Sequence, residues 1–118
     1  MKGFFALPEQ HAEYRIAARL LTQEPPLDRQ VLEEVMGRPR RYSELQPLLA
    51  GRNDNVLNKA LGRLRDDGVL QQGLDFAKGQ KTYSLTTLGK LVIFRMHEMV
   101  PHRESILAYE RGIAALGA

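Results

Sequence analysis

The feature that most constrains the fold is a thin apolar stripe in mid-chain, followed at once by strand-like sequence. Leu57, Leu61 and Leu64 recur at helical spacing, and the residues around them are mostly polar. The helical pattern ends at Gly68, and residues 69–85 then have the composition of a β-hairpin. This stretch therefore predicts one amphipathic helix that is followed directly by two strands.

Two more helices are expected earlier in the chain. Residues 8–22 carry apolar side chains at helical spacing, and Pro8 suits a first-turn position. Asp28 can cap a second amphipathic helix, and Gly37 is placed to close its C-terminus. Both segments are typical of helices that bury one face.

A short third helix is expected just before the leucine helix. An extended link over residues 38–42 leads to Ser43 and Gln46, which have the spacing of a capping box. Either Asn53 or Asp54 can then cap the leucine helix. Two short helices joined through a glycine-containing turn are therefore predicted here.

Two further helices are expected after the hairpin, whose strands we place at residues 69–74 and 80–85. Thr86 or Thr87 can cap a fifth helix, and Pro101 is placed to open a sixth. Two helices followed by a hairpin are typical of a helix-turn-helix with a wing.

The predicted fold class is mainly α with a small β-hairpin (α+β), a winged helix-turn-helix with extra terminal helices. We expect one domain over residues 1–118, with the winged core at 28–85 and terminal helices at 8–22 and 87–116.

The composition excludes several other classes of protein. With no cysteine in 118 residues, disulfide frameworks and thiolate sites are ruled out. The apolar run at residues 4–7 is too short for a signal peptide, and no segment approaches the length of a membrane span. We therefore expect a cytoplasmic protein that does not enter the membrane.

Positive charge is concentrated around the two central helices. Residues 38–65 contain seven cations and two anions, a local charge of +5, whereas the net charge of the whole chain is +3. This segregation is the pattern that phosphate neutralisation requires. It favours double-stranded DNA as a partner.

The leucine helix is the candidate element for reading bases, because its outward positions offer amides and cations. Arginines before the third helix would clamp the backbone, and lysines near the hairpin tip would reach the adjacent groove. A solvated helix face is the alternative interpretation. The predicted DNA contacts are Arg38, Arg40, Arg41, Ser43, Asn53, Asn55, Asn58, Lys59, Arg63, Lys78 and Lys81.

The fifth helix is too apolar for a lone surface helix, so a second buried face is expected. A homodimer would supply that face. Alternatively, the first and last helices of the same chain cover it. The predicted interface residues are Ile16, Leu20, Leu91, Phe94, Met99, Ile106 and Ile113.

No catalytic, metal or cofactor site is expected. His97 and His102 are five residues apart with Pro101 between them, whereas a zinc-protease helix needs histidines four apart. No activated nucleophile or phosphate-binding glycine loop can be assembled from the sequence. The chain is therefore not expected to be an enzyme.

The sequence resembles the HxlR-type winged helix-turn-helix regulators of bacteria and archaea over about residues 27–99. The resemblance is carried by residues 37–45 (GRPRRYSEL), Val56-Leu57, Leu61, Leu64, Asp67-Gly68-Val69, Tyr83-Ser84-Leu85-Thr86 and Leu88-Gly89. It implies a dimeric transcription factor that binds DNA through residues 53–65 and the wing, in a family where some members sense redox state or small molecules.

The chain departs from the family pattern at several positions. It lacks the N-terminal cysteine of redox-sensing members, which excludes thiol sensing. Arg52 stands where an aliphatic residue is usual, Ala60 stands where a basic residue is common, and the hairpin is a residue shorter and lacks prolines. The alternative function is therefore a winged-helix module without specific DNA reading, which serves as a protein-interaction or small-molecule-binding scaffold.

Overall fold

The structure, a computed structural model, describes residues 8–102 and confirms the α+β winged helix. Two short 3-10 segments, η1 and η2, accompany the helices and strands. In chain order the elements are α2 (Pro8–Thr22), α3 (Leu27–Val35), β1 (Arg40–Arg41), α4 (Tyr42–Leu45), η1 (Gln46–Leu49), α5 (Asp54–Asp66), β2 (Leu70–Asp75), β3 (Gln80–Leu85), α6 (Thr87–Met99) and η2 (Val100–His102).

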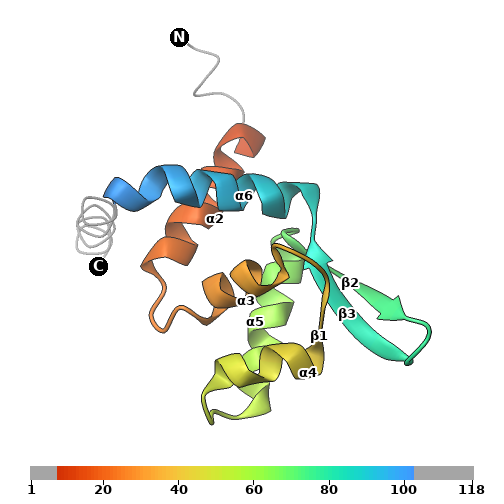
Figure 1. Cartoon of the computed structure of the whole chain (residues 1–118). Coiled ribbons are helices and arrows are strands. Elements are labelled where there is room, and N and C mark those ends of the chain that lie inside the picture. The colour runs from red at the N-terminus through yellow and green to blue at the C-terminus, as the bar shows by residue number, and fades with distance from the viewer. Residues whose placement is uncertain (1–7, 103–118) are drawn as a thin grey trace.

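The core is enclosed by α2, α3, α4, α5 and α6, with the sheet at its edge (Figure 1). The leucine stripe of α5 is buried as expected: Leu57 and Leu64 are fully enclosed, and Leu61 is 2% exposed. Leu32 of α3 and Leu45 of α4 are also fully buried in this cluster. Burying five such side chains fixes the face that α5 turns outward.

The sheet has three antiparallel strands in the order β1-β3-β2, one more than the sequence predicted. The extended link before α4 supplies β1, in which Arg40 pairs with Tyr83. Two residues are too short to show strand periodicity, and the partner strand is some 40 residues away, so only the extended conformation was predictable. The β2–β3 hairpin projects from the body as a wing (Figure 1).

Two predicted helix caps are confirmed. The Asn53 side chain caps α5 by accepting a hydrogen bond from the Asn55 backbone N–H at 2.7 Å. The Thr86 hydroxyl caps α6 by accepting from the Gly89 N–H at 2.9 Å. These short-range signals fix where both helices begin.

Two other predicted caps are wrong. Helix α3 begins at Leu27, so Asp28 lies inside its first turn, where it is 1% exposed and faces the core. Helix α4 begins at Tyr42, so Ser43 is not a cap, and the Glu44 carboxylate instead accepts from the Arg41 backbone N–H at 2.9 Å. In both places, the helix has already begun before the polar residue that was expected to cap it.

Helix α2 packs across α6 and covers one of its apolar faces (Figure 1). Val92, Ile93 and Met96 are buried in the single chain, so α2 covers this face, as expected of the first helix in the alternative to the dimer. Leu20 of α2 is fully buried in the chain's own core and is not available to a partner subunit, which corrects its assignment to the dimer interface. The predicted last helix, with Ile106 and Ile113, lies outside the described residues.

A close backbone approach joins α6 to the hairpin. A Cβ atom at Gly89 would lie 2.2 Å from the Val69 carbonyl oxygen, which already accepts a hydrogen bond from the Thr86 N–H. Only glycine fits this position without a backbone shift.

Among residues 8–102, no helix has both the length and the apolarity needed to cross a bilayer.

Candidate nucleic-acid interface

The outer face of α5 consists of amide and cationic side chains. Asn55, Asn58 and Lys59 are exposed, and Asn53 is exposed at the helix start. Their direction follows from the buried leucines on the opposite side of the helix. A helix backed by the core in this way can present hydrogen-bonding groups to the edges of bases.

Arg63 lies on the same helix but is held by a carboxylate. Its Nε donates to Asp28 Oδ2 at 3.0 Å, and its Nη2 donates to Asp28 Oδ1 at 2.8 Å. The Asp28 hydrogen bond raises the pKa of the guanidinium, whose side chain remains 47% exposed. The first role of Arg63 in this structure is therefore to join α5 to α3, and its contact with DNA remains a prediction.

Three of the predicted DNA contacts come together around one open cleft. Arg41 of β1, Ser43 of α4 and Lys81 of β3 line it, with Tyr42 and Gln80, and its volume is about 300 Å³. Ser43 and Lys81 are exposed, whereas Arg41 is half-buried. Two cations and a hydroxyl from three elements form a site suited to an anionic oxygen.

Glu44 organises the arginines that precede α4. Its carboxylate accepts from Arg38 Nη2 at 2.7 Å and lies 3.9 Å from nitrogens of both Arg40 and Arg41. The hydrogen bond from Arg38, the hydrogen bond from the Arg41 N–H and the charges of these two arginines lower the pKa of Glu44 to about 2. The cluster is thus fixed in place by one anion, which neutralises part of its charge.

Arg38 and Arg40, the two arginines of this cluster that precede Arg41, differ in how accessible their side chains are. Arg40 Nε donates to the Glu34 carbonyl at 2.8 Å, which directs the side chain to the end of α3. Arg38 keeps 53% of its side chain exposed. Arg38 is therefore the more accessible of the two.

The wing is tied to α5 by a contact that the sequence analysis missed. Arg65 Nη1 donates to Gln72 Oε1 of β2 at 2.8 Å. Lys78 and Lys81 are exposed on the hairpin, and Leu74 and Phe76 are exposed beside them. The two apolar residues were not predicted as functional, because their exposure could not be known before the hairpin was placed on the core.

The structure explains both departures inside the helix-turn-helix. Arg52 donates from Nε to the Leu49 carbonyl at 2.8 Å and from Nη2 to the Leu48 carbonyl at 3.2 Å, so it caps the C-terminus of η1. Ala60 is fully buried on the inner side of α5, where a basic side chain would not fit. Neither position removes a group from the outer face of α5.

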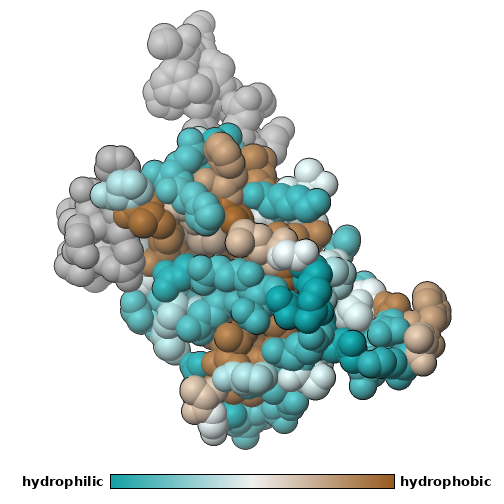
Figure 2. Space-filling view, viewed as in Figure 1, coloured by the Kyte–Doolittle hydropathy of each residue, from teal (hydrophilic) through white to brown (hydrophobic). Residues whose placement is uncertain are grey.

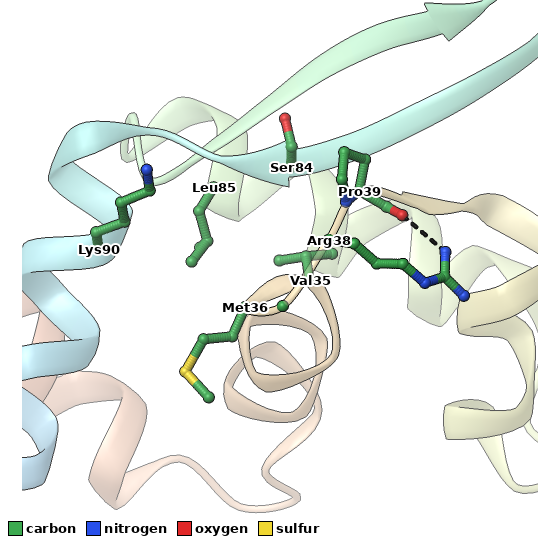
Figure 3. A pocket seen from close by; sticks show the side chains of 8 residues that line it. Val35, Met36, Arg38, Pro39, Ser84, Leu85 and Lys90 are labelled. Carbon is green, nitrogen blue, oxygen red and sulfur yellow. Dashed lines mark hydrogen bonds between the residues drawn. The ribbon is translucent and has the colours of Figure 1, made fainter.

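A second cleft of about 210 Å³ lies between the end of α3 and the start of α6 (Figure 3). Leu85 points into it between Met36 and Lys90, whereas Arg38 turns away and donates to the Pro39 carbonyl at 3.1 Å. A neighbouring opening of about 290 Å³ shares Met36, Leu85 and Lys90 and extends to Phe94.

Among the described residues, no group of three histidine, aspartate or glutamate side chains could hold a metal ion.

Together, the three-helix core, the three-stranded sheet and the projecting hairpin define a winged helix-turn-helix protein. The model of the HxlR-like helix-turn-helix family matches residues 28–110, and the chain belongs to that family. Its members are DNA-binding regulators of transcription, so the fold and the family agree on this class of protein.

Comparison with solved structures gives the same fold. The chain is similar to a protein from Enterococcus faecalis V583 described as a transcriptional regulator of the MarR family, with a TM-score of 0.63 and 18% identity. The match covers 91% of this chain and 94% of that one. No curated protein matches the sequence.

Proposed function

We propose that the protein is a homodimeric, sequence-specific regulator that reads double-stranded DNA with α5. The observation that carries this proposal is that α5 is buried on one side only. Leu57, Leu61 and Leu64 face the core, while Asn58 and Lys59 face outward. Asparagine can read adenine in the major groove, and lysine can reach guanine or phosphate. Family membership and the regulator described for the Enterococcus faecalis structure support this function.

The cleft lined by Arg41, Ser43 and Lys81 supplies the backbone contact. It lies beside the start of α4, on the side from which the wing projects, and two of the residues that line it, Arg41 and Lys81, are cations. Contacts to phosphate set the position of a protein on the duplex without reading sequence. We assign this cleft to a phosphate of the strand that flanks the groove occupied by α5.

The dimer uses the part of α6 that α2 leaves uncovered. Leu91 is 39% exposed and Phe94 is 58% exposed, whereas Val92 and Met96 on the covered side are buried. A second copy would bury this patch and place two copies of α5 roughly 34 to 36 Å apart, one turn of the duplex. Ile16 and Met99, which were also predicted at the interface, are only partly buried.

The test of base reading is a double substitution on the outer face of α5. Asn58→Ala with Lys59→Glu should abolish preference for a selected site in fluorescence anisotropy, because both side chains are exposed and neither supports the core. Arg15→Glu on α2 is the matched control, an exposed cation on a helix outside the helix-turn-helix. Unchanged discrimination between the selected and a scrambled duplex would refute the assignment of α5.

The alternative is a winged-helix scaffold without specific DNA reading, which binds a small molecule or another protein. The cleft between α3 and α6 favours it, because apolar walls from Met36 and Leu85 stand beside the ammonium group of Lys90 (Figure 3). Thermal stabilisation by a small amphipathic acid without measurable DNA binding would support this function instead.

A further inference from the structure

The tip of the wing carries a large apolar side chain in full contact with solvent. Phe76 is 87% exposed, and Leu74 is 48% exposed at the end of β2. Figure 2 shows apolar residues gathered at the end of the projecting hairpin, beyond the body of the molecule. Exposing a phenyl ring on a projecting turn has no benefit for folding, so the ring points to an interaction.

The turn that presents Phe76 is well defined. Asp75 accepts from the Ala77 N–H at its carboxylate (3.1 Å) and from the Lys78 N–H at its carbonyl (3.2 Å), and Gly79 closes the loop with φ of +63°. Asp75 Oδ2 also lies 4.0 Å from Arg41 Nε. The carboxylate next to Phe76 is therefore occupied by the protein's own donors.

One face of the hairpin runs from the core to the tip. Leu70 is buried and pairs with Leu85. Gln72, two positions further along β2, pairs with the buried Tyr83. Two positions further, Leu74 pairs with Lys81 on the same face. At this point the face has left the core, and an apolar and a cationic side chain stand next to each other in solvent.

The charges around the tip identify the partner. Lys78 is exposed in the turn itself and Lys81 is exposed near the start of β3, and the cationic cleft at Arg41 adjoins the turn through the contact with Asp75. A partner must therefore offer apolar surface next to negative charge. The DNA minor groove has this form, since its sugar and base surfaces lie between two phosphate strands.

We propose that Phe76 is an apolar wedge that enters the DNA minor groove and partly unstacks a base step, while Lys78 and Lys81 contact the flanking phosphates. The proposal rests on the proposed function and adds to it a bend in the bound DNA. Apolar wedges of this kind kink the duplex towards the major groove, and they favour the flexible steps TA and CA/TG.

The experiment uses the full chain and a duplex that contains its binding site, with 2-aminopurine placed at the step beneath the wing. Binding of the wild-type protein should raise the fluorescence of the probe, because unstacking relieves its quenching. Phe76→Ala should lose this rise and weaken binding roughly tenfold. Its salt dependence should not change, because no charge is removed.

Two matched variants make the result interpretable. Phe76→Leu keeps an apolar wedge and should retain most of the fluorescence change, whereas Lys59→Ala should weaken binding but leave the change in the remaining complex intact. All three variants should melt at the wild-type temperature, because both positions are exposed.

An unchanged affinity and an unchanged fluorescence signal for Phe76→Ala would overturn the wedge. So would loss of the dimer in that variant by sedimentation, which would assign the tip to a second copy, or binding of the wild type to anionic vesicles that Phe76→Ala loses. If the wild-type protein binds no duplex at all, the proposed function fails, and that result is distinct from a failure of the wedge.

Discussion

Arg63 on the outer side of α5 and Asp28 in the first turn of α3 form a two-pronged ion pair, with nitrogen–oxygen distances of 2.8 and 3.0 Å. Asp28 is 1% exposed, so its charge is compensated by a side chain that itself reaches solvent. The pair connects the helix proposed to read DNA with the helix behind it. Mutations at Arg63 therefore affect the fold as well as any contact with DNA.

Removing Arg63 should destabilise the protein. Arg63→Ala leaves the buried Asp28 carboxylate without its partner, and we expect the free energy of unfolding to fall by about 1–3 kcal/mol. Urea denaturation measures this change. Arg65→Ala is the control, because Arg65 is exposed and its hydrogen bond goes to the exposed Gln72. Equal stability of the two variants would show that the ion pair is not needed for the fold.

Glu44 should give the stability a specific dependence on acid. Its pKa is lowered to about 2 by Arg38 and the Arg41 N–H, so the folded protein binds this proton less readily than the unfolded chain. Its contribution is therefore complete above the ordinary carboxyl pKa of 4.5 and is lost as the pH falls towards 2. Between pH 6 and 2, the melting temperature of the wild type should fall more than that of Glu44→Gln.

The matched control for Glu44 is Glu33→Gln, which changes an exposed carboxylate on α3. It should follow the wild-type curve across the same pH range. Parallel curves for the wild type and Glu44→Gln would contradict the role of Glu44 as the anion that holds the arginine cluster.

Two glycines should respond to alanine in opposite directions. Gly89→Ala forces a methyl group against the Val69 carbonyl and should destabilise the fold by about 1–3 kcal/mol. At Gly62, no described residue lies within 4 Å of an added Cβ, so Gly62→Ala should stabilise α5 by about 1 kcal/mol. Thermal unfolding of both variants checks the pair. Tolerance of alanine at Gly89 would show that α6 can move away from the hairpin.

The proposed dimer depends on the uncovered part of α6. Phe94→Asp places a charge in that patch and should yield a monomer in sedimentation equilibrium, with weaker DNA binding because half-sites are no longer read together. The protein should remain folded, because Phe94 is 58% exposed in the single chain. A dimer of undiminished stability would place the interface elsewhere.

Local signals predicted much of the fold. The leucine stripe, the cap at Asn53 and the cap at Thr86 each depend on residues within a few positions, so the sequence alone could locate α5 and α6. The hairpin was likewise visible in its turn residues. Each of these features is set by spacing along one segment of chain.

The features that were missed depend on distant segments. Asp28 is a residue type that often caps helices, but here it is buried and forms an ion pair with Arg63, which lies 35 residues away in the sequence. The spacing of Leu20 along the helix could not show that the chain's own core buries it, so Leu20 was assigned to a dimer interface. The candidate site divides in the same way: the outward residues of α5 were predictable, and the cleft that joins Arg41 to Lys81 was not.

Whether α5 and the surrounding cations hold a duplex can be measured by binding to the DNA upstream of the protein's own gene across a salt series. We expect the affinity to fall steeply and linearly on a double-logarithmic plot, and Lys81→Ala to reduce the slope by about one. A wild-type affinity that does not change with salt, or a slope that Lys81→Ala leaves unaltered, would contradict this expectation.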